Sequence, residues 1–413
     1  MQMVGCTLDK TLLVLGGGPD QIPGISKAKE MGIYTIVLDG NPNADAKKYA
    51  NEFHTVSIKH FEQIEEFIKN KLTKKVDGVI AFGVDIASII AKTADTLDVN
   101  YTIPLESAKL SEDKFISKVF MHKNSIPIPE YKQVENLEDI KSFIADVGFP
   151  VIIKPVDNSA ARGISLIYSD EQLSLFFEHA QKLSPSKKVI IEQYLSGPQI
   201  TTESIVYDNN IFNICCSDRN YNDIDKFLPN IIENGGDLPS IYMKEKHKNQ
   251  LKNYLNIISK NLNIKNGIIK GDIVIHNDEL YIIEFALRLS GGNFSGFQIQ
   301  HHTGINFLLL CIHLHLGDNI DTNHMKQTTK NILSIRYKFP EDVNSGKIKN
   351  IQLPKKNNNI LFSNFHVNVE DTISEKTTNH AERLGFAIAT GNTREDAIKN
   401  AQKYLDNVEI ICE

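Results

Sequence analysis

Long apolar runs and blocks of basic residues are missing from this sequence of 413 residues. The longest apolar run covers residues 307–312, which is far shorter than the roughly 20 residues of a membrane-spanning helix. The N-terminus has no basic region followed by a long apolar one, and the net charge of −6 does not suggest nucleic acid as a partner. We therefore expect a cytoplasmic protein that binds neither membranes nor nucleic acid.

Cysteine is also scarce. The five cysteines, at positions 6, 215, 216, 311 and 412, lack the spacing of metal ligands or redox pairs, and the adjacent pair is expected in a strand. Histidines at 301, 302, 313 and 315 raise the question of zinc, but His313 and His315 lie two positions apart on an expected helix and face apart. The pattern fits a reducing compartment and does not favour a zinc centre.

With 41% hydrophobic and 23% charged residues, the composition is typical of a soluble protein of two to four domains. The N-terminal third alternates apolar strands, expected at 12–15, 34–38 and 78–82, with amphipathic helices, expected at 24–31, 61–72 and 87–97. This order predicts a doubly wound parallel sheet in an N-terminal α/β domain over residues 1–110.

The first turn of this domain is rich in glycine. Its sequence, residues 16–21, could suggest a dinucleotide site, with Asp39 as the ribose-binding acid. However, Gln21 replaces the third glycine and Pro19 removes an amide that could bind phosphate. A turn that lets the backbone approach a substrate, with Gly17 as a contact, or one that merely reverses the chain, fits better.

The pattern changes near Ser111, where a helix is expected to begin, and residues 126–129 read as an extended linker. Strands are then expected at 151–154, 164–168, 189–194 and 200–206, with a helix at about 306–316. From residue 332 short strands and a helix over 393–405 follow. We expect a two-lobed domain over 111–330, with lobes at about 125–195 and 196–330, and a small C-terminal α+β domain over 331–413.

Two acidic residues stand in a predicted hairpin. Period-two runs over 269–275 and 280–286 flank a polar turn, and they carry Asp272 and Glu284. A buried carboxylate needs a partner, and Mg²⁺ is a partner that also holds nucleotide phosphates. Because side chains alternate faces, the two acids oppose each other only if the loop is odd or a bulge shifts the register. The alternative is a pair of exposed charges on an edge hairpin.

Two further segments offer groups for a nucleotide. Lys154 ends an apolar strand, and the polar loop 157–163 that follows supplies Ser159, Arg162 and Gly163, which suit a flap over phosphate. Residues 192–195 follow another apolar strand, where Glu192 and the backbone can meet a purine edge. Each signal alone is also typical of an ordinary surface turn.

In order and spacing, these segments resemble the ATP-grasp superfamily over nearly the whole chain, in the type of its carboxylate-amine ligases, amino-acid ligases and carbamoyl-phosphate-synthase or biotin-carboxylase-like enzymes. The resemblance implies that Lys114 and Lys154 bind ATP phosphates, and that Glu192 with the backbone of Tyr194 and Leu195 binds adenine. It also implies that Asp272 and Glu284 hold Mg²⁺, with Mn²⁺ as a substitute. The resemblance further implies that Arg288 binds the substrate carboxylate or the acyl phosphate. Gly291 and Gly292 would be backbone donors beside it.

Two positions depart from the family pattern. Ala286 stands where many members have an asparagine ligand, which leaves open whether one or two Mg²⁺ bind, and Ala160 replaces a common glycine of the phosphate loop. Arg219, in a polar loop between the nucleotide segments, is a candidate for a second carboxylate or an ordinary surface residue.

The favoured function is therefore an ATP-dependent ligase that activates a carboxylate as an acyl phosphate and joins it to an amine. Its expected partners are small-molecule carboxylates and amines, and a homodimer is allowed. One alternative keeps the fold but activates bicarbonate or formate. Another is a nucleotide-binding regulator without turnover, which only Ala286 suggests.

Overall fold

The structure, a computed structural model, describes residues 9–413, so Cys6 lies outside the described part. The N-terminal unit is a four-stranded parallel sheet in the order β3-β2-β1-β4. Its strands are β1 (Thr11–Leu15), β2 (Tyr34–Asp39), β3 (Glu52–Thr55) and β4 (Gly78–Ile80), and its helices are α1 (Ile22–Glu30), α2 (Phe61–Asn70) and α3 (Ala87–Thr96). The parallel sheet predicted for this segment is confirmed.

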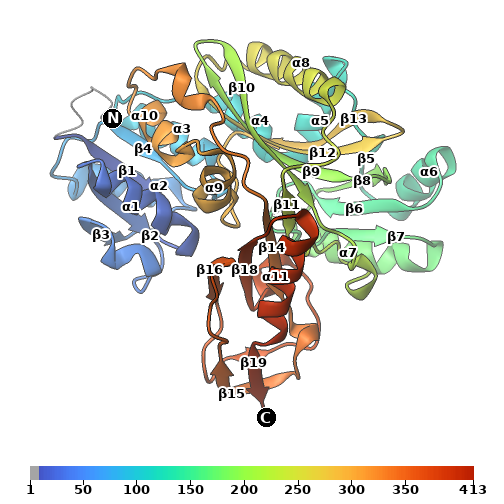
Figure 1. Ribbon diagram of the computed structural model, residues 1–413. Helices are drawn as coiled ribbons and strands as arrows, with labels where there is room; N and C mark the ends of the chain where they lie inside the picture. Colours follow the sequence, from blue (N-terminus) through green and yellow to red (C-terminus); the bar gives the residue numbers. More distant parts are fainter. Residues whose placement is uncertain (1–8) are drawn as a thin grey trace.

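Strand β1 is buried on both faces because helices cover both sides of the sheet. Leu12 and Val14 pack in one cluster with α1 and with α10 (Phe307–His315), which comes from a distant part of the chain. Leu13 and Leu15 pack in the other cluster with α2 and α3. The carboxyl ends of the strands face the middle of the molecule (Figure 1), where residues of the turns after β1 and β4 border a cavity.

The connection to the next unit corrects one expectation. Instead of one helix that begins at Ser111, the chain forms α4 (Leu105–Glu112) and α5 (Lys114–Lys123). Asp113 separates them because its extended backbone ends α4 and its carboxylate accepts the Ile116 N–H at 2.9 Å. Asp113 is thus an N-cap, and it fixes Lys114 as the first residue of α5.

The first lobe is a four-stranded antiparallel sheet in the order β5-β8-β6-β7. It contains β5 (Tyr131–Val134), β6 (Val151–Pro155), β7 (Ser165–Ile167) and β8 (Val189–Gln193), with helices α6 (Leu137–Val147) and α7 (Leu173–Leu183). Alternate strand residues pack against both helices, as in the buried pair Ile153 and Ile191. The opposite sheet face remains free for the site.

The second lobe belongs to an eight-stranded sheet in the order β13-β12-β9-β10-β11-β14-β18-β16. Its strands are β9 (Gln199–Tyr207), β10 (Asn210–Arg219), β11 (Gly236–Leu238), β12 (Gly267–His276), β13 (Glu279–Ala286), β14 (Leu333–Lys338), β16 (Ile360–Phe365) and β18 (Gly385–Thr390), and α8 (Glu245–Asn261) and α11 (Arg394–Asp406) pack on it. The cysteine pair lies in β10, as expected. The sheet runs across the boundary expected at residue 330, because β11 pairs with β14.

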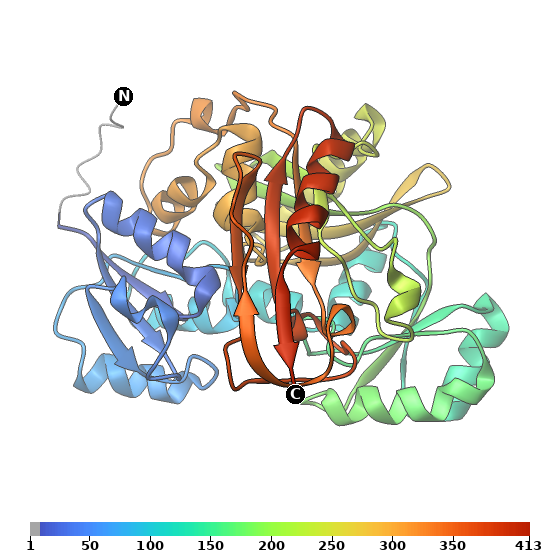
Figure 2. The ribbon, with the colours of Figure 1, turned by 60° about the horizontal axis from the view of Figure 1, so that its bottom comes forward.

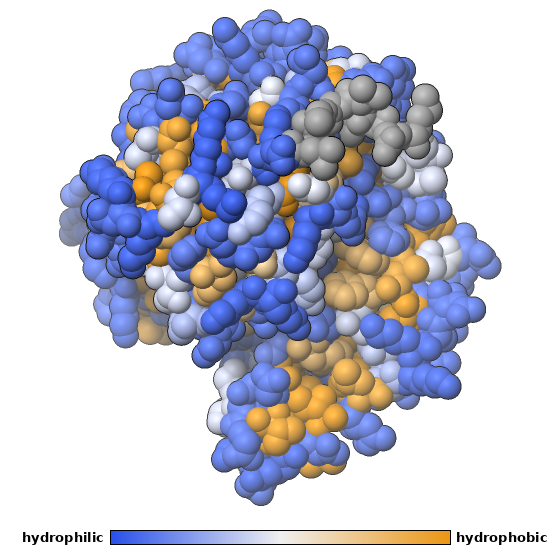
Figure 3. Space-filling view, turned by 90° about the vertical axis from the view of Figure 1, so that its left-hand side faces the viewer, coloured by the Kyte–Doolittle hydropathy of each residue, from blue (hydrophilic) through white to orange (hydrophobic). Residues whose placement is uncertain are grey.

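The C-terminal segment thus extends the large sheet and adds a three-stranded sheet of its own, β17 (Thr372–Ile373), β15 (Gly346–Gln352) and β19 (Glu409–Cys412). Its strands stand between the N-terminal sheet and the first lobe in Figure 2. On the face in Figure 3, apolar side chains gather at the lower end, over this unit. None of the helices within residues 9–413 has the length and apolarity that crossing a membrane takes.

Candidate active site

A cavity of about 770 Å³ lies where the N-terminal sheet, both lobes and the C-terminal strands meet. It brings together most of the predicted site residues, although they span the chain from α5 to the loop after β13. Those on its wall are Lys114, Lys154, Ser159, Arg162, Glu192, Tyr194, Leu195, Arg219, Asp272, Glu284, Arg288, Gly291 and Gly292. Two predicted contacts, Gly17 and Gly163, are not on the wall.

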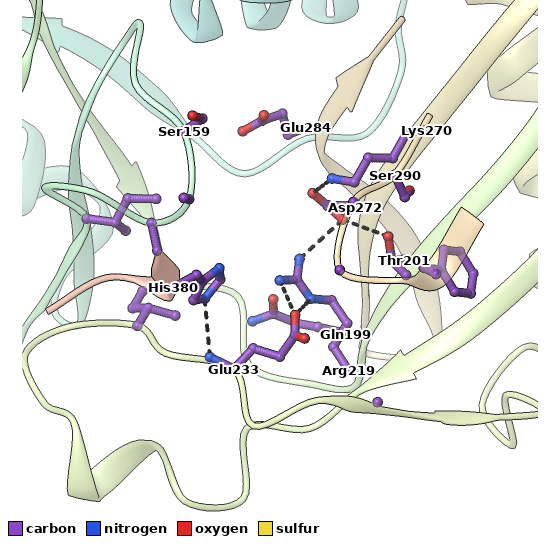
Figure 4. Close-up of a pocket in the computed structure, with 18 of the residues that line it drawn as sticks. Ser159, Gln199, Thr201, Arg219, Glu233, Lys270, Asp272, Glu284, Ser290 and His380 are labelled. Atoms are coloured by element: carbon purple, nitrogen blue, oxygen red, sulfur yellow. Dashed lines mark hydrogen bonds and ion pairs between the residues drawn. The ribbon is translucent and has the colours of Figure 1, made fainter. Parts of the chain in front are cut away.

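The two acidic residues face the cavity side by side because a β-bulge corrects their register (Figure 4). The hairpin loop holds two residues, Asn277 and Asp278, both at positive φ, so the simple register would place Asp272 opposite Ile283. Ile283 is instead an extra residue, and Asp272 pairs directly with Glu284. The sequence predicts that the two acids oppose each other only with an odd loop or a bulge, and the structure contains the bulge.

Asp272 is surrounded by positive charge. Its carboxylate pairs with Lys270 and with Arg219 Nη1 at 3.2 Å, and it accepts the Thr201 hydroxyl at 3.1 Å. Burial opposes its ionisation, but the two cations hold the pKa of Asp272 well below its usual value. Glu284 lies 3.6 Å from Lys114 Nζ. Two carboxylates on adjacent strands form a hard-oxygen donor set that suits Mg²⁺.

Glu192, Lys154 and Lys118 form a buried ion cluster beside the cavity. Glu192 Oε1 lies 2.7 Å from Lys154 Nζ and 3.3 Å from Lys118 Nζ, and all three side chains are almost fully buried. Burial lowers the pKa of Lys118 to about 8, although Glu192 opposes this shift. Lys118 also donates to the carbonyl of Ile283 at 3.2 Å, the residue that the bulge inserts. Glu192 is thus bound to two lysines, a pairing that the sequence did not reveal.

The predicted phosphate loop is ordered by its own side chains. Arg162 donates to Asn158 Oδ1 and to Ser159 Oγ, both at 2.9 Å, and Lys114 Nζ donates to the Asn158 carbonyl at 2.7 Å. Ala160 and Ala161 both have positive φ, 56° and 61°, a conformation that is uncommon for residues other than glycine. The loop therefore holds a backbone conformation that favours glycine at Ala160, where the sequence departs from the pattern of the family that it resembles.

The two glycines off the wall have structural reasons for their identity. A Cβ on Gly163, which has a φ of 76°, would come 2.9 Å from Pro155, so this residue closes the loop onto β6. Gly17 donates its N–H to Asp39 Oδ2 at 2.7 Å. Asp39 therefore holds the glycine turn in place. Gly17 itself is not on the cavity wall, and the turn presents Pro19 and Asp20 to the cavity instead.

Arg288 and the glycines after it contact the N-terminal unit. Arg288 pairs with Asp85, which follows β4, and Gly292 donates its N–H to Asp20 Oδ2 at 3.2 Å. A Cβ on Gly83 would come 2.9 Å from Gly291 Cα, so the two backbones approach more closely than a side chain would permit. Asp20 and Asp85 were missed in the sequence because only the tertiary fold brings these loops to Arg288.

The C-terminal unit also reaches the cavity. Arg219 pairs with Glu233, whose backbone N–H donates to His380 Nε2 at 3.4 Å, and Arg383 donates to the Glu233 carbonyl. The His380 N–H donates to the carbonyl of Ala160 at 3.0 Å, which joins this unit to the phosphate loop. Arg219 is therefore a largely enclosed member of an ion network and not a fully exposed surface residue.

Comparisons with known proteins agree with this arrangement. Residues 113–323, slightly more than half of the chain, match the family described as "Carbamoyl-phosphate synthase L chain, ATP binding domain". An L-amino acid ligase from Bacillus licheniformis is 17% identical, with a TM-score of 0.79 and coverage of 98% of this chain and 99% of that one.

Two further solved structures share the fold. Phosphoribosylglycinamide synthetase from Anaerococcus prevotii is 20% identical, with a TM-score of 0.74 and coverage of 98% and 100% of the two chains. N5-carboxyaminoimidazole ribonucleotide synthetase from Thermotoga maritima is 18% identical, with a TM-score of 0.69 and the same coverage. The resemblance to the ATP-grasp superfamily is thus confirmed, and the chain belongs to the family of the ATP-binding domain of the carbamoyl-phosphate synthase L chain.

Proposed function

We propose that this protein is an ATP-dependent ligase that activates a small carboxylate as an acyl phosphate and joins it to an amine. The observation that carries the proposal is the direct pairing of Asp272 with Glu284 on the wall of a cavity that also contains Lys154 and Arg288. Family membership supports ATP as the nucleotide. Relatives in the fold include an L-amino acid ligase and a phosphoribosylglycinamide synthetase, whose names denote ligations of this general kind.

Lys114 and Lys154 are assigned to the ATP phosphates because both ammonium groups border the cavity beside the loop 157–163. Glu192 takes a different part from the one expected, since its buried carboxylate orients Lys154 and Lys118. The Tyr194 N–H already donates to the Pro150 carbonyl at 3.2 Å. We therefore assign recognition of the purine edge to the Leu195 backbone and to the Tyr194 carbonyl.

Asp272 and Glu284 are the residues that would hold Mg²⁺, with Mn²⁺ as a substitute. The bound ion supplies positive charge that neutralises the phosphoryl oxygens during transfer. To hold the ion, Asp272 would give up its contacts with Lys270 and Arg219, and both cations would remain beside the site to bind anionic oxygens. Ala286 offers no oxygen from its side chain, so a further ligand would have to come from water or phosphate.

Arg288 is assigned to the substrate carboxylate and to its acyl phosphate. Its guanidinium can form a bidentate pair with a planar carboxylate, and in the structure it already binds the carboxylate of Asp85. Substrate would therefore compete with or share this contact. No nucleophile on the protein is needed, because the phosphoryl group passes from ATP to the carboxylate oxygen and the amine then displaces phosphate at the acyl carbon.

A screen for phosphate release tests the proposal. The protein is given Mg²⁺-ATP with small carboxylates and amines, singly and in pairs, and products are identified by mass spectrometry. Release that depends on both a carboxylate and an amine supports the ligase. Release that depends on bicarbonate or formate selects the carboxylating or formylating alternative, and ATP binding without turnover in any mixture selects the regulator. Homodimer formation stays a prediction, which sedimentation velocity tests.

A further inference from the structure

One end of the cavity is bordered by three units of the chain. Asp20 comes from the turn after β1 and Gly292 from the loop after β13. Tyr337 and Phe386 come from the C-terminal strands β14 and β18, and His366 directly follows β16. A Cβ on Gly292 would come 3.3 Å from the Tyr337 hydroxyl, while the Gly292 N–H contacts Asp20 at 3.2 Å. These contacts bring the carboxylate of Asp20 close to the aromatic side chains.

Asp20 differs from the other carboxylates around the substrate. Asp85 pairs with Arg288, Glu233 with Arg219, and Asp272 with Lys270 and Arg219. Within residues 9–413, Asp20 has no ion pair, and a single backbone N–H is its only hydrogen-bond donor. A negative charge without a cation therefore faces the cavity.

The side chains opposite Asp20 are mostly aromatic. Arg383, whose guanidinium lies 3.8 Å from the centroid of the Tyr337 ring, is a cation on the same wall, but it is paired with Glu233 and not with Asp20. Phe386 packs edge-on against Tyr337, with ring centroids 6.2 Å apart, and lies 5.9 Å from the His366 ring. Burial lowers the pKa of His366, although the nearby carboxylates of Asp20 and Asp45 oppose the shift. The histidine therefore presents a neutral ring at pH 7. A carboxylate that has no cation of its own and lies beside aromatic rings can hold a positively charged nitrogen.

We propose that this end of the cavity binds a cationic nitrogen of the substrate, of the kind that the α-ammonium group of an amino acid provides, with Asp20 as its partner. The inference rests on the proposed function, because it names the substrate class of that site. It implies that one substrate is a free amino acid or a similar zwitterion, whose carboxylate lies toward Arg288 and whose ammonium group lies toward Asp20.

Calorimetric titration tests this subsite. Free amino acids and their N-acetyl derivatives are titrated into the parent protein, Asp20→Asn and the control Asp45→Asn, each with saturating Mg²⁺-ATP analogue. Asp45 is an exposed acid of the same unit that also acts on His366 but does not line the cavity. At least one free amino acid should bind the parent and the control alike, and Asp20→Asn about tenfold or more weakly, since one charge-assisted contact is lost.

Acetylation removes the cation from the ligand, so the acetylated compounds should bind weakly to all three proteins. They test the claim on the parent protein alone, independently of how well the variant folds. The subsite is overturned if no free amino acid binds the parent, if Asp20→Asn binds it as well as the control does, or if acetylation leaves affinity unchanged. Amino-acid binding without phosphate release in any mixture would instead refute the ligase and retain the subsite.

Discussion

The lysine pair on Glu192 leads to a prediction about stability and turnover together. Both lysines pair with the same oxygen, Glu192 Oε1, at 2.7 Å from Lys154 Nζ and 3.3 Å from Lys118 Nζ. With an effective dielectric constant of about 20, the direct attractions are about 6 and about 5 kcal/mol before desolvation is subtracted. Either lysine alone can therefore neutralise the buried carboxylate.

Replacing one lysine with methionine, which keeps a similar volume, should lower the free energy of unfolding by only about 1–2 kcal/mol, because the other lysine remains as the partner of Glu192. The double variant Lys118→Met/Lys154→Met leaves that carboxylate buried without a cation, a change that typically costs about 3–5 kcal/mol. We therefore expect the double variant to lose clearly more than the sum of the single losses. Urea denaturation followed by circular dichroism measures all four proteins of the cycle.

The two lysine variants should differ in their rates of ATP turnover. Lys154 borders the cavity and Lys118 does not, so Lys154→Met should lower ATP turnover by about a hundredfold or more, whereas Lys118→Met should retain most of it. Additive losses of stability would show that the lysines do not share Glu192. Equal inactivation of two well-folded single variants would show that Lys154 has no special contact with phosphate.

Three further changes test other parts of the site. Glu284→Gln should abolish ATP turnover while the thermal midpoint stays near that of the parent, and activity within about twofold of the parent would contradict metal binding by Glu284. Arg288→Lys keeps the charge but loses the bidentate geometry, so the KM for the carboxylate should rise and kcat should fall. The affinity for Mg²⁺-ATP, measured by calorimetry, should stay unchanged. A collapse of ATP affinity alone would make Arg288 a nucleotide ligand. Burial raises the pKa of Glu203, which accepts the Ser290 N–H, to about 7. Between about pH 4.5 and pH 7, the native protein therefore keeps a proton that the unfolded chain releases. The free energy of unfolding falls as the pH rises through this range. Glu203→Gln should remove about 3 kcal/mol of this decline, and an unchanged pH profile of unfolding would exclude Glu203 as its source.

The sequence was sufficient to predict features that depend on local pattern. The parallel N-terminal sheet follows from alternating apolar strands and amphipathic helices, and the hairpin of Asp272 and Glu284 follows from two period-two runs. The bulge at Ile283 could not be predicted, because its side chain fits either register. A tertiary contact accompanies it, since Lys118 from α5 donates to the Ile283 carbonyl.

The substrate side of the site was the least predictable. Asp20 and His380 are separated from Gly292 by long stretches of chain, and no local pattern marks them as neighbours. They meet because the carboxyl ends of the N-terminal strands and the C-terminal strands converge on one cavity. The continuous eight-stranded sheet was missed for the same reason: the pairing of β11 with β14 joins residues about a hundred positions apart.

Oxygen transfer from substrate to phosphate tests the central claim most directly. A carboxylate substrate labelled with ¹⁸O in both oxygens is turned over with unlabelled Mg²⁺-ATP and the amine, and the released phosphate is analysed by mass spectrometry. Activation as an acyl phosphate predicts that one labelled oxygen enters each phosphate, because the carboxylate oxygen that attacks the γ-phosphorus leaves with it. Product formation with phosphate free of label would contradict the account.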